Sequence, residues 1–64
     1  MFVNGKEMNI ESGITVDDLI NKLNIDKDKI VVEVNFEIIR KEEYCDRILV
    51  DSDKIEIIAF VGGG

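Results

Sequence analysis

Apolar and polar residues alternate near the start of the chain in a pattern typical of a β-hairpin. The apolar segment 1–3 precedes Asn4 and Gly5, and Met8 and Ile10 then alternate with polar residues. Asn-Gly is the preferred pair in a type I′ turn, because both central residues need a positive φ that Asn tolerates and Gly adopts freely. The pattern therefore predicts two short antiparallel strands.

An amphipathic helix is predicted after Thr15, whose hydroxyl is suited to the N-cap position. Asp18 occupies the N3 position, where it completes a capping box. The apolar residues that follow have the spacing i, i+3, i+4 and i+7: Val16, Leu19, Ile20 and Leu23. Asn24 is expected to end the helix. Because so short a helix is unstable alone, its apolar stripe must pack against a sheet.

The second half of the chain is typical of strands joined by turns. Residues 30–34 are almost all Ile or Val, which indicates a strand that is covered on both faces or central in its sheet. The elements expected after it are a turn at 35–36, a short return strand at 37–39, a polar connection at 40–46, an extended piece at 48–50, a turn at 51–53 and a last strand at 54–61. Together these elements predict an α+β fold: a mixed sheet of four to five strands with one helix across it. Its first and last strands should be parallel neighbours at the centre, because a long connection separates them.

Side chains of the last strand should alternate between two faces. Ile55, Ile57 and Ala59 share one face, and Glu56, Ile58 and Phe60 share the other. Because Glu56 marks the solvent side, Ile58 and Phe60 are predicted to be exposed apolar groups at a contact site for a partner. The alternative is that a flanking loop covers them.

Composition excludes several classes of function. One cysteine, Cys45, and no histidine leave no internal disulfide and no plausible zinc site in these 64 residues. A net charge of −6 disfavours nucleic acid and favours either a basic protein partner or simple solubility. No apolar run approaches the ~20 residues of a membrane span, and no signal peptide is recognisable. We therefore expect a cytoplasmic monomer.

The last three residues, Gly62, Gly63 and Gly64, are the most unusual chemical feature. Three residues without side chains contribute nothing to packing, but they can enter a slot too narrow for any Cβ and present the Gly64 carboxylate at its end. The alternative is a frayed end without a role. We expect a domain at 1–61 and a flexible tail at 62–64.

Other candidate sites are weaker. No histidine or cationic cluster activates Cys45, and a lone cysteine is usually a small packing residue. The carboxylates Glu42, Glu43 and Asp46 lie on a polar connection, where a solvated surface is the expected role. The neighbouring cations Arg40 and Lys41 could add contacts at the rim of a partner site.

Over its whole length the chain resembles the ThiS-type sulfur carrier proteins of thiamine biosynthesis, which have the ubiquitin-like β-grasp fold. The resemblance is carried by Val3 to Gly5, Thr15, Val16 and Leu19, Val32 to Asn35, Asp53 to Ile57 and, most specifically, Phe60 to Gly64. Three turns depart from the family pattern. Phe36 stands where the family often has glycine, Ile39 where it has proline before an arginine, and Ser52 where it has glycine between two aspartates.

The resemblance implies a carrier and co-substrate that has no active site of its own and binds no cofactor. An E1-like adenylating enzyme of the ThiF type would join the Gly64 carboxylate to AMP, using ATP and magnesium that the enzyme holds. Sulfur from a donor protein would then displace AMP, and a thiazole synthase of the ThiG type would receive the thiocarboxylate. Gly62 and Gly63 would thread into both active sites, and Ile58, Phe60 and Val61 would contact the partners.

Three alternatives stay open at this stage. The chain could supply sulfur to another pathway, as the small subunit of molybdopterin synthase does. It could be a ubiquitin-like modifier that forms amides with lysines of target proteins. It could also be a plain interaction module with an idle tail.

Overall fold

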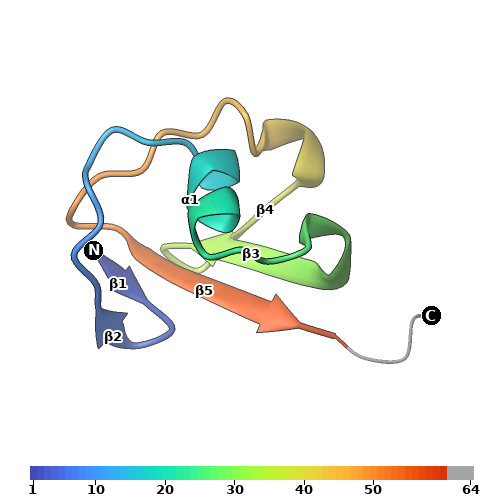
Figure 1. The fold of residues 1–64 in the computed structure, drawn as a ribbon, viewed down its shortest axis with the longest axis horizontal. Helices are drawn as coiled ribbons and strands as arrows, with labels where there is room; N and C mark the ends of the chain where they lie inside the picture. The colour runs from blue at the N-terminus through green and yellow to red at the C-terminus, as the bar shows by residue number, and fades with distance from the viewer. Residues whose placement is uncertain (61–64) are drawn as a thin grey trace.

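Residues 1–60 of the computed structural model form one mixed sheet with a single α-helix across it (Figure 1). The strands are β1 (Phe2–Val3), β2 (Lys6–Glu7), β3 (Ile30–Val34), β4 (Glu37–Ile39) and β5 (Lys54–Ala59), and the helix is α1 (Val16–Lys22). Short 3₁₀ turns occupy Lys27–Lys29 and Lys41–Glu43. The strand order is β2-β1-β5-β3-β4, with β1 and β5 parallel and the other neighbours antiparallel. The predicted fold class and the central parallel pair are therefore confirmed.

The N-terminal hairpin has the predicted turn. Asn4 and Gly5 have φ angles of 53° and 79°, which are the positive values that a type I′ turn requires. The strand after the turn is shorter than its alternating pattern suggested, because only Lys6 and Glu7 pair with β1. The backbone N–H of Met8 still donates to the carbonyl oxygen of Met1, and the chain then leaves the sheet.

The helix begins and ends where local chemistry predicted. The backbone N–H of Asp18 donates to Oγ1 of Thr15, and the N–H of Thr15 donates to Oδ2 of Asp18, both at 3.0 Å. This reciprocal capping box satisfies backbone donors that would otherwise lack partners. At the other end Asn24 has a φ of 57°, a left-handed conformation that helices commonly adopt just past their last turn.

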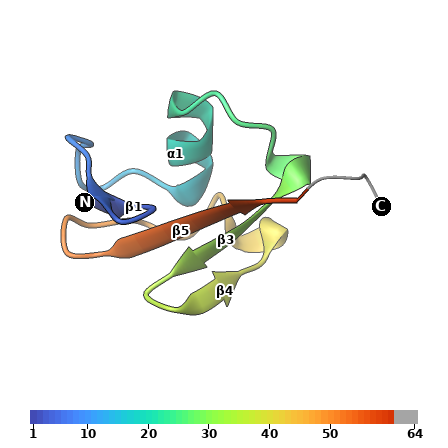
Figure 2. The ribbon, with the colours of Figure 1, turned by 90° about the horizontal axis from the view of Figure 1, so that it is seen from below.

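The core lies between α1 and one face of the sheet, and Figure 2 shows the helix on that side only. The fully buried side chains come from α1, β3, β5 and the connection before β5: Val16, Leu19, Ile20, Val32, Val34, Leu49 and Ile55. Along β3, buried side chains alternate with half-buried ones. The prediction of a strand inside the sheet is confirmed, while the opposite face of β3 is only partly covered.

The segment between β4 and β5 is more ordered than its polar sequence suggested. The Tyr44 ring is 3% exposed and Leu49 is fully buried, and Ile48 forms an isolated antiparallel bridge with Thr15. Burial raises the pKa of the Tyr44 hydroxyl above its ordinary value. Within residues 1–60, no helix is both long and apolar enough to span a bilayer.

Candidate functional site

Strand β5 carries the predicted site, and its first residues are fixed by a polar cluster around Asp53. Asp53 is 8% exposed. Its Oδ1 accepts a hydrogen bond from Nδ2 of Asn35 at 2.9 Å, and its Oδ2 accepts one from the backbone N–H of Val50 at 2.9 Å. Asn35 Oδ1 also accepts from the N–H of Lys54 at 3.0 Å. The cluster therefore joins the turn before β5 to the turn after β3.

Asn4 holds β5 from the other side. Its Oδ1 accepts a hydrogen bond from the backbone N–H of Ile57 at 2.7 Å, and its own N–H donates to the carbonyl oxygen of Ile55 at 2.9 Å. The side chain thus provides the acceptor that a longer β1 would have supplied from its backbone. Sequence reasoning assigned Asn4 to the turn alone, because nothing local indicates a contact across 53 residues.

The outward face of β5 is apolar near its end, as predicted. Ile58 is 48% exposed and Phe60 is 50% exposed, so no loop within residues 1–60 covers either of them. The backbone N–H of Phe60 donates to the carbonyl oxygen of Lys29 at 3.1 Å, which keeps the chain beside β3 after the strand ends at Ala59. The structure therefore confirms the exposure of the predicted contact residues.

Neighbouring strands extend this face. Val31 lies opposite Ile58 in the β3–β5 register, and Glu33 lies opposite both Glu56 on β5 and Ile38 on β4. Residues directly opposite each other project to the same side of a sheet. The two glutamates are thus neighbours of equal charge, and neither has an ion-pair partner within residues 1–60.

Four of the residues predicted from the sequence lie outside the residues that the structure describes: Val61, Gly62, Gly63 and Gly64. The roles of the glycines in threading, the role of the Gly64 carboxylate and the domain boundary after 61 stay predictions. The predicted last strand included Val61, whereas the described strand ends at Ala59.

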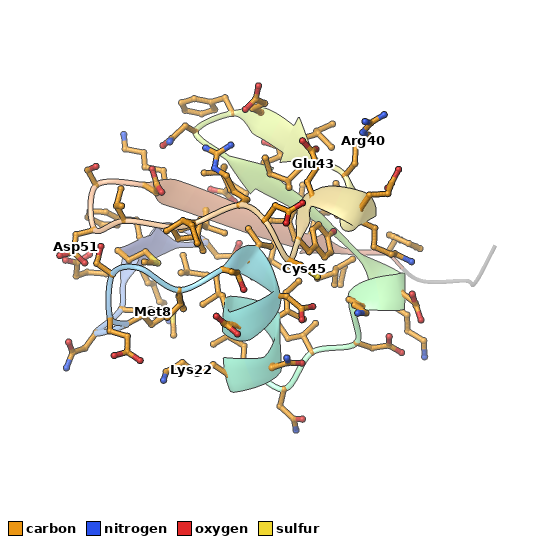
Figure 3. All side chains as sticks on the ribbon, turned by 90° about the horizontal axis from the view of Figure 1, so that it is seen from above. Met8, Lys22, Arg40, Glu43, Cys45 and Asp51 are labelled. Atoms are coloured by element: carbon orange, nitrogen blue, oxygen red, sulfur yellow. The ribbon has the colours of Figure 1, made fainter. Side chains whose placement is uncertain are left out.

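The weaker candidates form no site in the described part of the chain. No group of three or more His, Cys, Asp or Glu residues between 1 and 60 is placed to hold a metal ion. Glu43 accepts a hydrogen bond from the backbone N–H of Arg40 at 3.1 Å, so it stabilises its own 3₁₀ turn (Figure 3). The Cys45 thiol is free and exposed, so the expectation of a packing residue is wrong.

Lys41 is engaged within the fold. Its Nζ lies 2.6 Å from Oδ1 of Asp28. This hydrogen bond lowers the pKa of the Asp28 carboxyl below its ordinary value and raises the pKa of the Lys41 amine. Both groups lie on the surface, where an isolated pair contributes little to stability. The pair links the 3₁₀ turn after β4 to the one before β3.

The similarity of this chain to known proteins extends over its whole length. The ThiS family model matches residues 1–64. A thiazole synthase of Paramagnetospirillum magneticum is 42% identical over 64 residues, which are 100% of this chain and 20% of that protein. The sulfur carrier protein ThiS of Bacillus subtilis is 41% identical over 63 residues, with 97% of this chain and 96% of that protein covered. A crystal structure of the thiamine biosynthesis protein ThiS of Geobacter metallireducens has a TM-score of 0.80 and 27% identity, and the match covers 98% of this chain and 96% of that one.

Proposed function

The chain belongs to the ThiS family of sulfur carriers of thiamine biosynthesis, and we propose that its Gly64 carboxylate is the group that accepts the sulfur. The fold is the ubiquitin-like β-grasp that the resemblance implied. The observation that carries the proposal is the position of β5. This strand lies at the centre of the sheet, is bonded on both sides at its start, and leads directly into the glycine segment.

The chemistry requires activation of the carboxylate. A carboxylate is a poor electrophile, since its oxygen is a poor leaving group. Attack of a Gly64 carboxylate oxygen on the α-phosphorus of ATP forms an acyl adenylate and releases pyrophosphate. A thiol or persulfide sulfur then attacks the acyl carbon, and AMP leaves with the bonding electron pair. Sulfur suits this step because a thiol ionises readily near neutral pH. Attack by a donor persulfide gives an acyl disulfide. A second thiol then attacks the donor-side sulfur, forms a disulfide with the donor and releases the terminal thiocarboxylate.

The glycines suit this chemistry in two ways. Gly62 and Gly63 have no Cβ, so an extended backbone can pass through a channel that would exclude any other residue. Gly64 has no side chain beside its carbonyl carbon, so that carbon stays open to the incoming sulfur. A substitution at Gly62 or Gly63 would therefore hinder entry into the enzyme, and a substitution at Gly64 would hinder the attack of sulfur on the carbonyl carbon.

Two enzymes follow from this chemistry as partners. An E1-like adenylating enzyme would hold ATP and magnesium and form the adenylate, and a donor protein would supply the sulfur. A thiazole synthase would consume the thiocarboxylate, which agrees with the similarity of this chain to part of a thiazole synthase. In both complexes Ile58, Phe60 and Val61 would contact the enzyme, since the exposed pair lies directly before the tail. The chain itself would act as a co-substrate.

Mass spectrometry tests the proposal directly. The chain is incubated with the adenylating enzyme, ATP, magnesium and a sulfur source, and its C-terminal peptide should gain the mass difference of one oxygen replaced by one sulfur. Deletion of Gly64 should abolish this change completely, while Cys45→Ser should leave it intact. The reverse pattern would overturn the proposal. A Gly-Gly-Gly remnant joined to lysines of other proteins would instead identify a protein modifier.

A further inference from the structure

The two edges of β5 are paired over different lengths. On one side β3 pairs with β5 from Ile55 to Ala59. On the other side β1 pairs only with Lys54 and Ile55, because the chain turns at Asn4. Figure 1 shows β5 continuing well past the short β1, towards the C-terminal end of the molecule, and Figure 2 shows the same from a second direction.

Backbone alternation identifies the groups that this leaves open. In β5 the even-numbered residues bond to the β3 side: the carbonyl oxygen of Lys54 accepts from Asn35, and the N–H of Phe60 donates to Lys29. The backbone N–H and carbonyl groups of the odd-numbered residues point to the β1 side, where the N–H of Ile57 donates to the Asn4 side chain. The next groups on that side are the carbonyl oxygen of Ile57 and the N–H and carbonyl oxygen of Ala59. No strand between residues 1 and 60 lies opposite them.

The other edges of the sheet are protected in the usual ways. Proteins blunt exposed edges by keeping the strands short and by placing charged side chains or proline on them. The edge strand β2 has two residues, Lys6 and Glu7, and the edge strand β4 has three and begins with Glu37. The open stretch of β5 carries no charge after Glu56, contains no proline, and exposes Ile58 and Phe60. This stretch is therefore suited to pairing with another strand.

Two features next to the open stretch indicate what the added strand would carry. A hollow of about 350 Å³ lies over the start of β5 and ends one residue before the open stretch; it is lined by Phe2, Gly5, Lys54, Ile55 and Glu56. The cross-strand pair of Glu33 and Glu56 places two carboxylates on the face that bears Ile58. An apolar side chain fits the hollow, and a basic side chain complements the carboxylates.

We propose that the open edge of β5, from Ile57 to Ala59, takes up an extended segment of thiazole synthase as an added strand. The inference rests on the proposed function, which supplies the partner. Backbone hydrogen bonds to Ile57 and Ala59 would provide the register, and an apolar and a basic side chain would provide the selectivity. The added strand would continue the line of β1 and hold the glycine segment in a fixed direction as it enters the enzyme.

Hydrogen exchange of the Ala59 amide distinguishes an added strand from docking by side chains alone. In the free chain this amide should exchange quickly, while the amides of Ile58 and Phe60 on either side are protected by β3 and Lys29. In the complex with thiazole synthase, exchange at Ala59 should slow by about tenfold or more. NMR of the labelled 64-residue chain resolves these three amides separately.

A matched pair of variants tests the hydrogen bond that the Ala59 N–H would donate to the added strand. Ala59→Pro removes the N–H, and Ala59→Ser keeps it on a residue of similar size. Since no residue from 1 to 60 lies opposite this N–H, the proline should leave the protection of the β3–β5 amides unchanged. It should weaken binding to thiazole synthase by about tenfold, the effect of one lost hydrogen bond in a desolvated interface, and the serine variant should bind within about twofold.

The outcomes separate this inference from the proposed function. Slowed exchange at Ala59, together with weak binding of the proline variant only, supports the added strand. A complex in which Ala59 exchanges as in the free chain overturns it, as does equal binding by the two variants. Absence of any complex with thiazole synthase overturns it as well. In each of these cases formation of the Gly64 thiocarboxylate is measured independently and decides the proposed function by itself.

Discussion

The two halves of β5 differ in what surrounds them. The first half has β1 on one side and β3 on the other, begins at the Asp53 cluster, and buries Ile55 to 1% exposure. The second half has β3 on one side only, and its Ile58 is 48% exposed. One strand of six residues therefore stabilises the fold at its start and presents an accessible surface at its end.

The difference shows how so small a domain accommodates a contact surface. A chain of this size buries only about 60% of its unfolded surface, so it has little stability to spare. Exposed apolar groups placed among the core strands would weaken the fold. Here the stabilising contacts are concentrated in the half of β5 that is farther from the tail. Changes in the two halves should consequently have separable effects.

The largest effect is expected from Ile55→Ala. Removing a fully buried aliphatic side chain should lower the free energy of unfolding by about 3 kcal/mol, since the lost burial is compounded by a cavity. Ile58→Ala makes the same chemical change three residues further along β5, on the exposed face, and should cost less than about 1 kcal/mol. Urea denaturation of both variants gives the comparison. Equal losses of stability would mean that the two halves are not distinct.

Binding to the adenylating enzyme should depend on the second half of β5 and not on the first. The double variant Ile58→Asp and Phe60→Asp should weaken binding to the adenylating enzyme by about a hundredfold, because two apolar contacts are replaced by charges beside Glu56. Ile48→Asp makes a similar change at a residue that is 51% exposed on the segment paired with Thr15, and it should bind normally. Calorimetric titration measures both. If the double variant bound normally and lost only stability, the face that carries Ile58 and Phe60 would not be a contact surface for the adenylating enzyme.

A smaller effect is expected at the Asp53 cluster. Asp53→Ala leaves the N–H of Val50 and the amide of Asn35 without their acceptors, so the free energy of unfolding should fall by about 2 kcal/mol. Asp51→Ala removes an exposed carboxylate from the same turn and serves as the control for lost charge. If the two variants were equally stable, the cluster would not be what fixes the start of β5.

The features predicted correctly from the sequence depend on local chemistry or on alternation. The Asn4–Gly5 turn, the capping box of Thr15 and Asp18, and the two faces of β5 each follow from residues close together in the chain. Such signals determine an element and its orientation without reference to the rest of the fold. They were sufficient for the fold class and for the exposure of Ile58 and Phe60.

The features that were missed depend on contacts between distant segments. Asn4 and Ile57 are separated by 53 positions, and Asn35 and Asp53 by 18. An asparagine or aspartate in a turn has local uses as well, so its distant partner has no signature in the sequence. The early end of β2 and the open edge of β5 were missed for the same reason. A strand's length depends on which neighbour is present to pair with it.

The smallest predicted effect concerns the turn after β3, which repeats the backbone of the first hairpin turn with a different residue. Asn35 and Phe36 have φ angles of 52° and 69°, but Phe36 has a bulky side chain that is 85% exposed. A left-handed conformation costs such a residue about 1–2 kcal/mol, and glycine avoids most of that cost at some expense in the entropy of the unfolded chain. Phe36→Gly should therefore stabilise the fold by about 0.5–1 kcal/mol in thermal denaturation.

Phe36→Ala is the control, because it removes the ring and keeps the strained backbone, and it should give no comparable gain. If both variants were equally stabilised, exposure of the ring would be the cause, and the left-handed backbone would cost nothing measurable. If neither were stabilised, the bonds of Asn35 to Asp53 and Lys54 would already hold this turn well enough to make its side chain irrelevant to folding. That second result would locate the stabilising contribution of this turn in Asn35, on the side that faces the first half of β5.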